Sequence, residues 1–385
     1  MHETVWAEAR RVLCVRLDNL GDVLMSTPAM HALKHARPGR RLTLLASRGG
    51  AMLAPHLDDV EEVVAYDAPW VKGGCPDVDA DRQLIEALRE ARFDAAVIFT
   101  VYSQNPLPAA LICRLAGIPR VLAHCRENPY ALLSDWIPET EPAKQIRHEV
   151  QRQLDLVERV GAKAGSDCHL RFTTRETDRA RLYAKLAARG LHAGQPWIVA
   201  HCGASAPSRR YPAESYARAF ALLGDRAGAI VLTGSVHERP ITAEVARGCA
   251  GNATVIDMAG HLSLGELACL IEDASLLVSN NTGPVHLAAA LATPVVDLYA
   301  QTNPQHTPWL VPQRVLSHDV PCRNCYRSVC PEMHHACLRG VLPQRVCDAV
   351  LELLAQIRTR AQVTPARPML MEMSNAHIGN QRHVS

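Results

Sequence analysis

The sequence predicts an α/β protein made of two doubly wound units in tandem. Short, β-rich apolar runs alternate with longer segments of helical periodicity along most of the 385 residues. Strands that are separated by helices imply parallel sheets covered on both faces. A polar, charged run at 164–179 interrupts this alternation and divides it into two series. We therefore expect two Rossmann-like domains, with a boundary within this run.

The first series begins with a β-rich run, 11–16, followed by a segment whose residues Val23, Leu24, Met30 and Leu33 are spaced as on one helix face. The same criteria predict further strands at 42–46, 60–66, 95–100 and 120–124. They predict helices at 22–35, 50–56, 81–91 and 108–116, and a long helix at 143–164.

The second series predicts strands at 197–201, 229–233, 254–257, 276–278 and 295–299, and helices at 213–223, 241–249, 264–272 and 284–291. We expect domains at 1–165 and 166–342 and a C-terminal helix at 343–361. The tail at 362–385 holds Pro, Asn, Gly and His without periodicity, so we expect it to be disordered.

The composition argues against several classes of protein. Because 41 Lys and Arg stand against 39 Asp and Glu, and the basic residues are scattered, we expect no nucleic-acid partner. No apolar run reaches the roughly 18 residues of a membrane span, and the first residues lack a secretory signal pattern. Most of the 13 cysteines lie singly in apolar segments, as reduced thiols do. We therefore expect a cytoplasmic protein.

Open parallel sheets bind ligands at the carboxyl ends of their strands, and two facing units would form a cleft there. The first such loop, Arg16–Asp22, carries two carboxylates, Asp18 and Asp22, around Gly21. Gly21 permits a close backbone approach, and Asp22 can either cap the following helix or project into the cleft. Both roles stay open from the sequence.

The loop at 279–286 also ends a strand and begins a helix. Its Asn281, Thr282 and Gly283 precede Pro284, a residue favoured in the first helical turn. Free backbone N–H groups and the positive end of the helix dipole suit a diphosphate, to which Thr282 and His286 can donate further hydrogen bonds. The alternative is that Asn281 and Thr282 only cap the helix while His286 packs beneath it.

Two more loops of the second unit are candidates for ligand contacts. The loop at 201–212 is rich in small residues, including Ser205, and then has Arg209 and Arg210, either of which can bind phosphate bidentately. An exposed basic turn is the alternative. In the loop at 234–239, Glu238 can accept a hydrogen bond from a sugar hydroxyl.

Four cysteines are clustered near the end of the second unit. Their number suits a structural Zn²⁺ or iron site, and the first pair has the two-residue spacing of a metal knuckle. We nevertheless expect reduced thiols in a compact loop, with a structural metal site as the alternative. The cluster consists of Cys322, Cys325, Cys330 and Cys337, with His334 and His335 between them.

Taken in order, these loops resemble those of the glycosyltransferase family 9 heptosyltransferases, which use ADP-heptose to build the inner core of lipopolysaccharide. The resemblance covers about residues 11–355. It is carried by Arg-Leu-Asp-Asn-Leu-Gly-Asp-Val at 16–23, His-Glu-Val at 148–150, Gly-Ala-Ser at 203–205, Arg-Arg-Tyr-Pro at 209–212, Ser-Leu-Gly-Glu-Leu at 263–267 and Asn-Thr-Gly-Pro-Val-His at 281–286.

The resemblance implies the GT-B architecture, with an acceptor domain and a nucleotide-sugar domain facing across a cleft. It also implies inverting transfer without an essential metal or cofactor. Asp22 matches the general base of the family, and Arg209 lies where the family usually has a phosphate-binding lysine. The other residues expected to bind the donor are Ser205, Glu238, Met258 (near the adenine pocket), Asn281, Thr282, Gly283 and His286.

The acceptor implied by the resemblance is a lipid-linked saccharide at the cytoplasmic face of the inner membrane, with transient membrane contact. Candidate acceptor residues are Asp18, Arg48 and Arg120. Asn281 stands where many relatives have aspartate, so a role that needs negative charge would be lost there. Two alternatives therefore stay open: transfer of another sugar, or to a protein or capsule glycan, and a nucleotide-binding relative without turnover.

Overall fold

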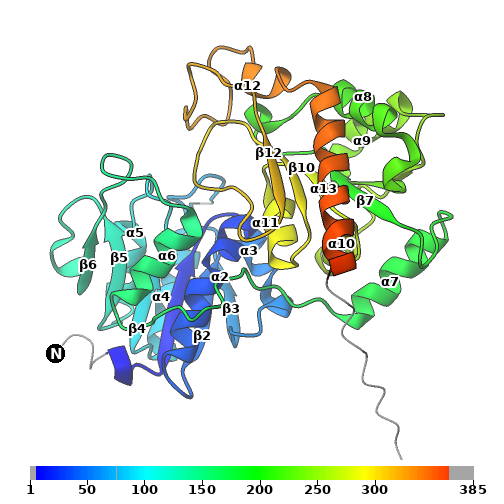
Figure 1. Cartoon of the computed structure of the whole chain (residues 1–385). Helices are drawn as coiled ribbons and strands as arrows, with labels where there is room; N and C mark the ends of the chain where they lie inside the picture. Colours follow the sequence, from blue (N-terminus) through cyan, green and yellow to red (C-terminus); the bar gives the residue numbers. More distant parts are fainter. Residues whose placement is uncertain (1–5, 75, 364–385) are drawn as a thin grey trace, which may run out of the picture.

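A computed structural model describes residues 6–74 and 76–363 of the chain. It contains two six-stranded sheets, and every strand pair in both is parallel. Figure 1 shows them in two separate halves of the molecule, one coloured blue to green and the other green to orange. The prediction of two Rossmann-like units is confirmed. The tail expected at 362–385 lies almost wholly outside the described residues.

The first sheet has the strand order β3-β2-β1-β4-β5-β6. Its inner strands are apolar on both faces because helices cover both sides, and β1 is buried at five of its six positions. The strands are β1 (Arg11–Arg16), β2 (Arg41–Ala46), β3 (Glu62–Ala65), β4 (Ala95–Ile98), β5 (Val121–Cys125) and β6 (Asp135–Pro138). The helices are α2 (Leu20–His35), α3 (Arg48–Ala51), α4 (Val78–Ala91), α5 (Leu107–Leu115) and α6 (Glu149–Glu158).

The second sheet has the order β12-β11-β10-β7-β8-β9. Its strands are β7 (Trp197–His201), β8 (Ala229–Thr233), β9 (Val255–Asp257), β10 (Leu277–Asn280), β11 (Val295–Leu298) and β12 (Gln313–Leu316). Its helices are α7 (Glu176–Ala187), α8 (Ala213–Leu223), α9 (Arg239–Gly248), α10 (Leu264–Glu272), α11 (Gly283–Ala290), α12 (Ala336–Arg339) and α13 (Pro343–Val363). None of the helices in the described part of the chain is long and apolar enough to cross a bilayer.

The two halves share one apolar core. Val12 of β1 and Val199 of β7 belong to the same cluster of buried residues, which continues through α2 and α11. These two helices pack against each other, and Figure 1 shows them between the sheets. Because the loop before each helix follows a central strand of its sheet, this packing brings two strand-end loops together.

Several elements differ from the sequence predictions, among them the short helix α12, which was not predicted. The edge strands β6 and β12 were not predicted, because β6 has no fully buried position and β12 has only one, so their apolar pattern is weak. Helix α7 begins inside the run expected to be a connection, and only Asp178, Leu182 and Leu186 on it are buried. The helix expected at 143–164 is shorter, since α6 spans only Glu149–Glu158.

Candidate active site

The loop after β1 presents Asp22 at the start of α2. The carboxylate accepts a hydrogen bond from the backbone N–H of Asn19 through Oδ2 at 3.3 Å, so it caps the free end of its own helix. Its other oxygen, Oδ1, lies 3.3 Å from Nη2 of Arg16. The side chain is 16% exposed. Asp22 therefore caps its helix and keeps a partly exposed carboxylate, but it lines neither of the two cavities described below.

Arg16 holds three carboxylates at this point. The guanidinium is fully buried, with Nε 3.0 Å from Asp18 and Nη1 3.0 Å from Glu149, in addition to its contact with Asp22. The Nε contact is an ion pair without the alignment of a hydrogen bond. A buried cation among three acids fixes their positions, since leaving any of these charges unpaired would be costly.

The ionisation of this cluster follows from burial and charge. Burial by itself would lower the pKa of Arg16, but Asp18, Glu149 and Asp22 raise it by more, so the guanidinium stays charged. Burial raises the pKa of Asp18 and of Glu149, against the opposing charge of Arg16. Gln104 and Gln153 each donate a hydrogen bond to one of these two acids.

Across the cleft, the loop after β10 begins α11. Thr282 is the N-cap residue in an extended conformation, and Gly283 and Pro284 form the first turn. Pro284 has no N–H group, while the N–H of Val285 donates to the Thr282 carbonyl at 3.0 Å. The hydroxyl of Thr282 donates to the carbonyl of Asn280 at 3.3 Å. The turn and the helix dipole leave a site with positive potential next to Gly283.

The two helix starts touch. A Cβ atom at Gly21 would lie 2.8 Å from Cδ2 of His286 and 3.5 Å from Cα of Gly283. Only glycine fits at position 21, because carbon atoms in ordinary contact are at least about 3.5 Å apart. Asp22 therefore lies one residue from the point where α2 meets the Thr282–Gly283 turn.

His286 fills this contact between the halves. Its ring is 4% exposed, and Nδ1 is buried without a hydrogen-bond partner. Burial lowers the pKa of His286 well below its ordinary value, and the charge of Arg209 lowers it further. The imidazole is therefore neutral. Both sequence interpretations of His286 stay open, since it packs inside the protein and still has a free ring nitrogen.

Asn281 points into the protein. Its side-chain amide donates to Oδ2 of Asp297 at 3.0 Å and to the carbonyl of His306 at 2.8 Å. Asp297 is fully buried, and burial raises its pKa to about 8. An aspartate at position 281 would set two carboxyl groups against each other here, whereas the amide supplies a donor. This pairing gives a physical reason for asparagine at this position.

Arg209 lies at the end of a short helical turn, Pro207–Arg209, and is partly exposed. Within the described ranges its guanidinium forms no ion pair with an acidic side chain. Burial and then the charge of Arg209 lower the pKa of His306, and Arg209 also contributes to the lowered pKa of His286. Arg210 instead donates to the carbonyl of Ala204 at 2.7 Å. Ser205 is exposed in the same loop.

A cavity of about 340 Å³ lies between the halves. Leu20 and Met52 line it from the first half, and Glu238 and Gly283 line it from the second. Glu238 accepts a hydrogen bond from the N–H of Ser235 at 2.7 Å. The other lining residues are His201, Thr233, Gly234, Ser235, Leu262, Ser263, Leu264, Pro284, Leu267 and Leu287.

The sequence analysis did not select the apolar wall of this cavity. Leu262, Leu264 and Leu267 surround the start of α10, and their spacing reads as an ordinary helix face. The feature of the sequence that could have identified this wall is the position of the segment directly after the end of β9, since ligands bind at the carboxyl ends of parallel strands. Met258, expected near the adenine pocket, is fully buried and does not line the cavity.

A second cavity, of about 310 Å³, lies on the first half beside Asp18. Trp70, Phe99 and Gln104 are among its lining residues. Arg48 and Arg120 do not line it. Arg48 is largely exposed and forms an ion pair with Asp67 at 2.8 Å. Of the three candidate acceptor residues, the structure brings only Asp18 to this cavity.

The segment at 148–150 joins the halves. His148 accepts from the N–H of Val150 at Nδ1, so its Nε2 carries the proton that it donates to the Thr307 carbonyl at 2.9 Å. Burial lowers the pKa of His148, which keeps the ring neutral. The N–H of Glu149 donates to the Gln305 carbonyl at 3.0 Å. The acid that contacts Arg16 is thus anchored to the second half.

The four clustered cysteines line one small cavity of about 20 Å³ together with His334 and His335. Cys322 Sγ lies 3.9 Å from Nε2 of His334. No three of these side chains bring their ligand atoms within 4.8 Å of one another. The structure therefore gives no support to the alternative of a Zn²⁺ or iron site.

Comparisons with known proteins agree with this architecture. Residues 82–336, more than half of the chain, match the model of glycosyltransferase family 9 (heptosyltransferase). The chain belongs to glycosyltransferase family 9. This family 9 chain is 26% identical to lipopolysaccharide heptosyltransferase 2 of Escherichia coli over 90% of its own length and 99% of that protein. It is accordingly a glycosyltransferase.

Solved structures extend the comparison to the fold. The structure of E. coli ADP-heptose lps heptosyltransferase II superposes with a TM-score of 0.72 at 25% identity, covering 90% of this family 9 chain and 99% of that one. A family 9 glycosyltransferase from Veillonella parvula superposes with a TM-score of 0.76 at 20% identity, covering 90% and 98%. The GT-B architecture implied by the sequence resemblance is confirmed.

Proposed function

We propose that this enzyme transfers heptose from ADP-heptose to an inner-core saccharide of lipopolysaccharide, with inversion at the anomeric carbon and Asp22 as the general base. The contact between the starts of α2 and α11 carries the proposal, because it brings the Asp22 carboxylate near the turn that suits a diphosphate. Similarity over 90% of the chain to lipopolysaccharide heptosyltransferase 2 supports the choice of donor and acceptor.

In this mechanism the acceptor hydroxyl attacks the anomeric carbon of the heptose as its proton passes to Asp22. The bond between that carbon and the diphosphate oxygen breaks, and its electron pair leaves with ADP. Each oxygen of Asp22 has one protein contact, so each keeps a lone pair for the hydroxyl. A single displacement of this kind inverts the anomeric centre and needs no covalent enzyme intermediate.

The second half would stabilise the leaving diphosphate. Arg209 has a guanidinium that no acidic side chain of the described ranges neutralises, and the first turn of α11 adds the helix dipole. These positive groups act on charge that grows as the bond breaks, which is the most effective use of electrostatics in catalysis. This half also contains Ser205, Glu238, Thr282 and Gly283, which the family resemblance implies as donor-binding residues.

The acceptor would enter from the first half, where the cavity beside Asp18 has a partly aromatic wall. Aromatic and polar groups together suit a saccharide, which has apolar ring faces and hydroxyl edges. We place the reaction at the cytoplasmic face of the inner membrane, where a lipid-linked acceptor would be presented. No metal or cofactor takes part in the proposed steps.

Turnover with defined substrates tests this proposal. Purified protein would be incubated with ADP-heptose and truncated lipopolysaccharide acceptors, and ADP release and the mass of the acceptor would be followed. We expect ADP release matched by the addition of one heptose, and an inverted anomeric configuration by NMR. Transfer from a different sugar nucleotide only, or to a protein or capsule glycan only, would replace the substrates proposed here. Retention of configuration would overturn the mechanism.

A further inference from the structure

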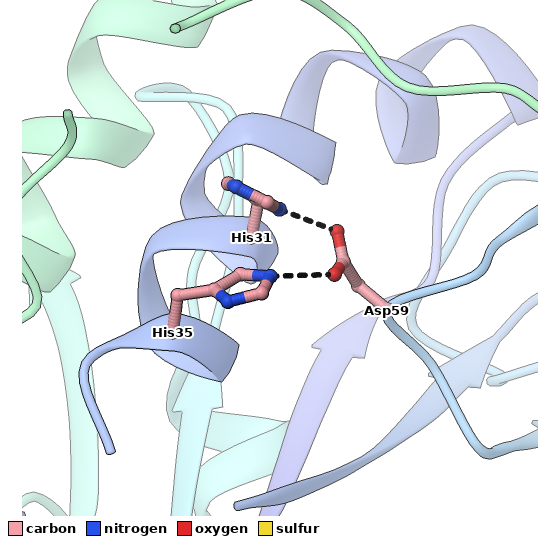
Figure 2. A group of neighbouring side chains, drawn as sticks. All are labelled: His31, His35 and Asp59. Atoms are coloured by element: carbon pink, nitrogen blue, oxygen red, sulfur yellow. Dashed lines mark hydrogen bonds and ion pairs between the residues drawn. The ribbon is translucent and has the colours of Figure 1, made fainter. Parts of the chain in front are cut away.

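The other end of α2 carries a group of side chains that the proposed reaction does not use. His31 and His35 are four residues apart on this helix, so their rings lie on the same face. Asp59, from the loop before β3, faces both of them (Figure 2). The described ranges 6–74 and 76–363 contain no other group in which three ligand atoms of His, Cys, Asp or Glu lie within 4.8 Å of one another.

The geometry of this group is close to that of a metal centre. Nδ1 of His31 lies 2.8 Å from one oxygen of Asp59, and Nε2 of His35 lies 3.3 Å from the other. In a tetrahedral site with bonds of about 2.0–2.1 Å, neighbouring ligand atoms are about 3.3 Å apart. An ion could enter after small side-chain movements, with the backbone unchanged.

The chemistry of the ligands narrows the choice of ion. Two imidazoles and one carboxylate suit a divalent transition metal such as Zn²⁺, whereas Mg²⁺ and Ca²⁺ prefer sites built from oxygen. The side chains of His31 and Asp59 are 28% and 19% exposed, and that of His35 is 61% exposed. The ligands are thus partly ordered by packing, and an ion can reach them from solvent.

We propose that His31, His35 and Asp59 form a binding site for a divalent transition-metal ion of the Zn²⁺ class. The ion takes the place of the N–H hydrogens through which the two rings contact the carboxylate, and each imidazole, bound as the neutral ring, keeps its one proton on the nitrogen that faces away from the ion. It joins the last turn of α2 to the loop before β3. This site is independent of the four cysteines and contains no thiolate.

The site is structural, because it lies far from the proposed chemistry. Asp22 and His31 are nine residues apart on α2, which corresponds to about 14 Å along the helix axis. Arg171, in the segment that connects the two halves, has its Nε 3.8 Å from Asp59 and its backbone N–H on Thr27 of α2. A bound ion would therefore stabilise a region where α2, a loop and the connecting segment meet.

Zinc titration of the full chain tests the proposal. Protein stripped with a chelator and kept reduced would be titrated with Zn²⁺ by calorimetry, and thermal unfolding would be followed with and without the ion. We expect a binding event, and a rise in Tm with Zn²⁺, that His35→Gln weakens by at least about tenfold. His31→Gln should act in the same way.

His169→Gln is the matched control. His169 pairs with Asp167 at 2.9 Å without a second histidine, so its loss should leave Zn²⁺ binding intact. Titration with Co²⁺ distinguishes binding at the cysteine cluster from binding at the histidines, because only thiolate ligands add charge-transfer absorption. Zinc affinity and stoichiometry equal to those of the wild type in His35→Gln would overturn the proposal. Binding seen only with thiolate absorption, or no binding, would overturn it as well. None of these results depends on glycosyl transfer.

Discussion

Gly21→Ala directly perturbs the contact between the two halves. The added methyl group would lie 2.8 Å from Cδ2 of His286, while carbon atoms in ordinary contact are about 3.5–4.0 Å apart. Relief of this overlap requires a movement of roughly 1 Å at the junction of α2 and α11. The ring of His286 is buried, so it has little room to move by itself.

The expected cost falls on catalysis more than on stability. A displacement of about 1 Å between reacting groups can reduce the rate about 100-fold, so we expect kcat/KM to fall by roughly 10- to 100-fold. Alanine is favoured over glycine within a helix by about 0.5–1 kcal/mol, which offsets part of the strain. ADP affinity should fall by less than kcat/KM, because His286 and Gly283, which the methyl group meets, are only part of the expected nucleotide site.

Steady-state glycosyl transfer, ADP calorimetry and thermal unfolding would measure these three quantities. Gly49→Ala is the matched control, because a methyl group there would meet only the Ser47 hydroxyl, at 3.8 Å. If Gly21→Ala retains wild-type kcat/KM, the two helix starts are not held together in the reacting enzyme. That result would refute the reasoning from this contact.

Two other predictions concern buried charges. Arg16→Met should lower the free energy of unfolding by about 3–5 kcal/mol, because three carboxylates lose their cation. Urea denaturation measures this loss, and a loss under about 1 kcal/mol would contradict this view of the cluster. Burial raises the pKa of Asp297 to about 8, so the folded protein keeps a proton that the unfolded chain loses above about pH 4. Wild-type stability should therefore fall between about pH 4 and pH 8, by up to about 1.4 kcal/mol per pH unit, and Asp297→Asn should remove this loss. Thermal unfolding of the wild type and of Asp297→Asn from pH 5 to pH 8 checks this. If the difference in Tm between the two proteins stays constant with pH, the prediction is wrong.

The sequence predicted the tandem parallel sheets because buried parallel strands read as apolar runs between helices. It also located the strand-end loops around Asp22 and Thr282, since the carboxyl end of each strand could be read from the same pattern. Edge strand β6 was not predicted, because its positions are only partly buried or exposed and its apolar signal is weak.

The remaining site features depend on contacts between distant parts of the chain. Arg16 and Glu149 are 133 residues apart, and nothing near either residue in the sequence indicates that they pair. The apolar wall formed by Leu262 and Leu264 becomes visible only when the two halves are oriented around one cavity. Likewise, the spacing of His31 and His35 could be read from the sequence, but the approach of Asp59 could not.

Asp22→Asn in a single-turnover assay tests the central claim most directly. The amide keeps the size of the side chain but is not a base, so we expect heptose transfer to slow by about 100- to 10,000-fold while ADP affinity is retained. Asp79→Asn, which changes a largely exposed carboxylate on α4, should behave as the wild type does. Transfer at the wild-type rate by the Asp22→Asn enzyme would contradict the account.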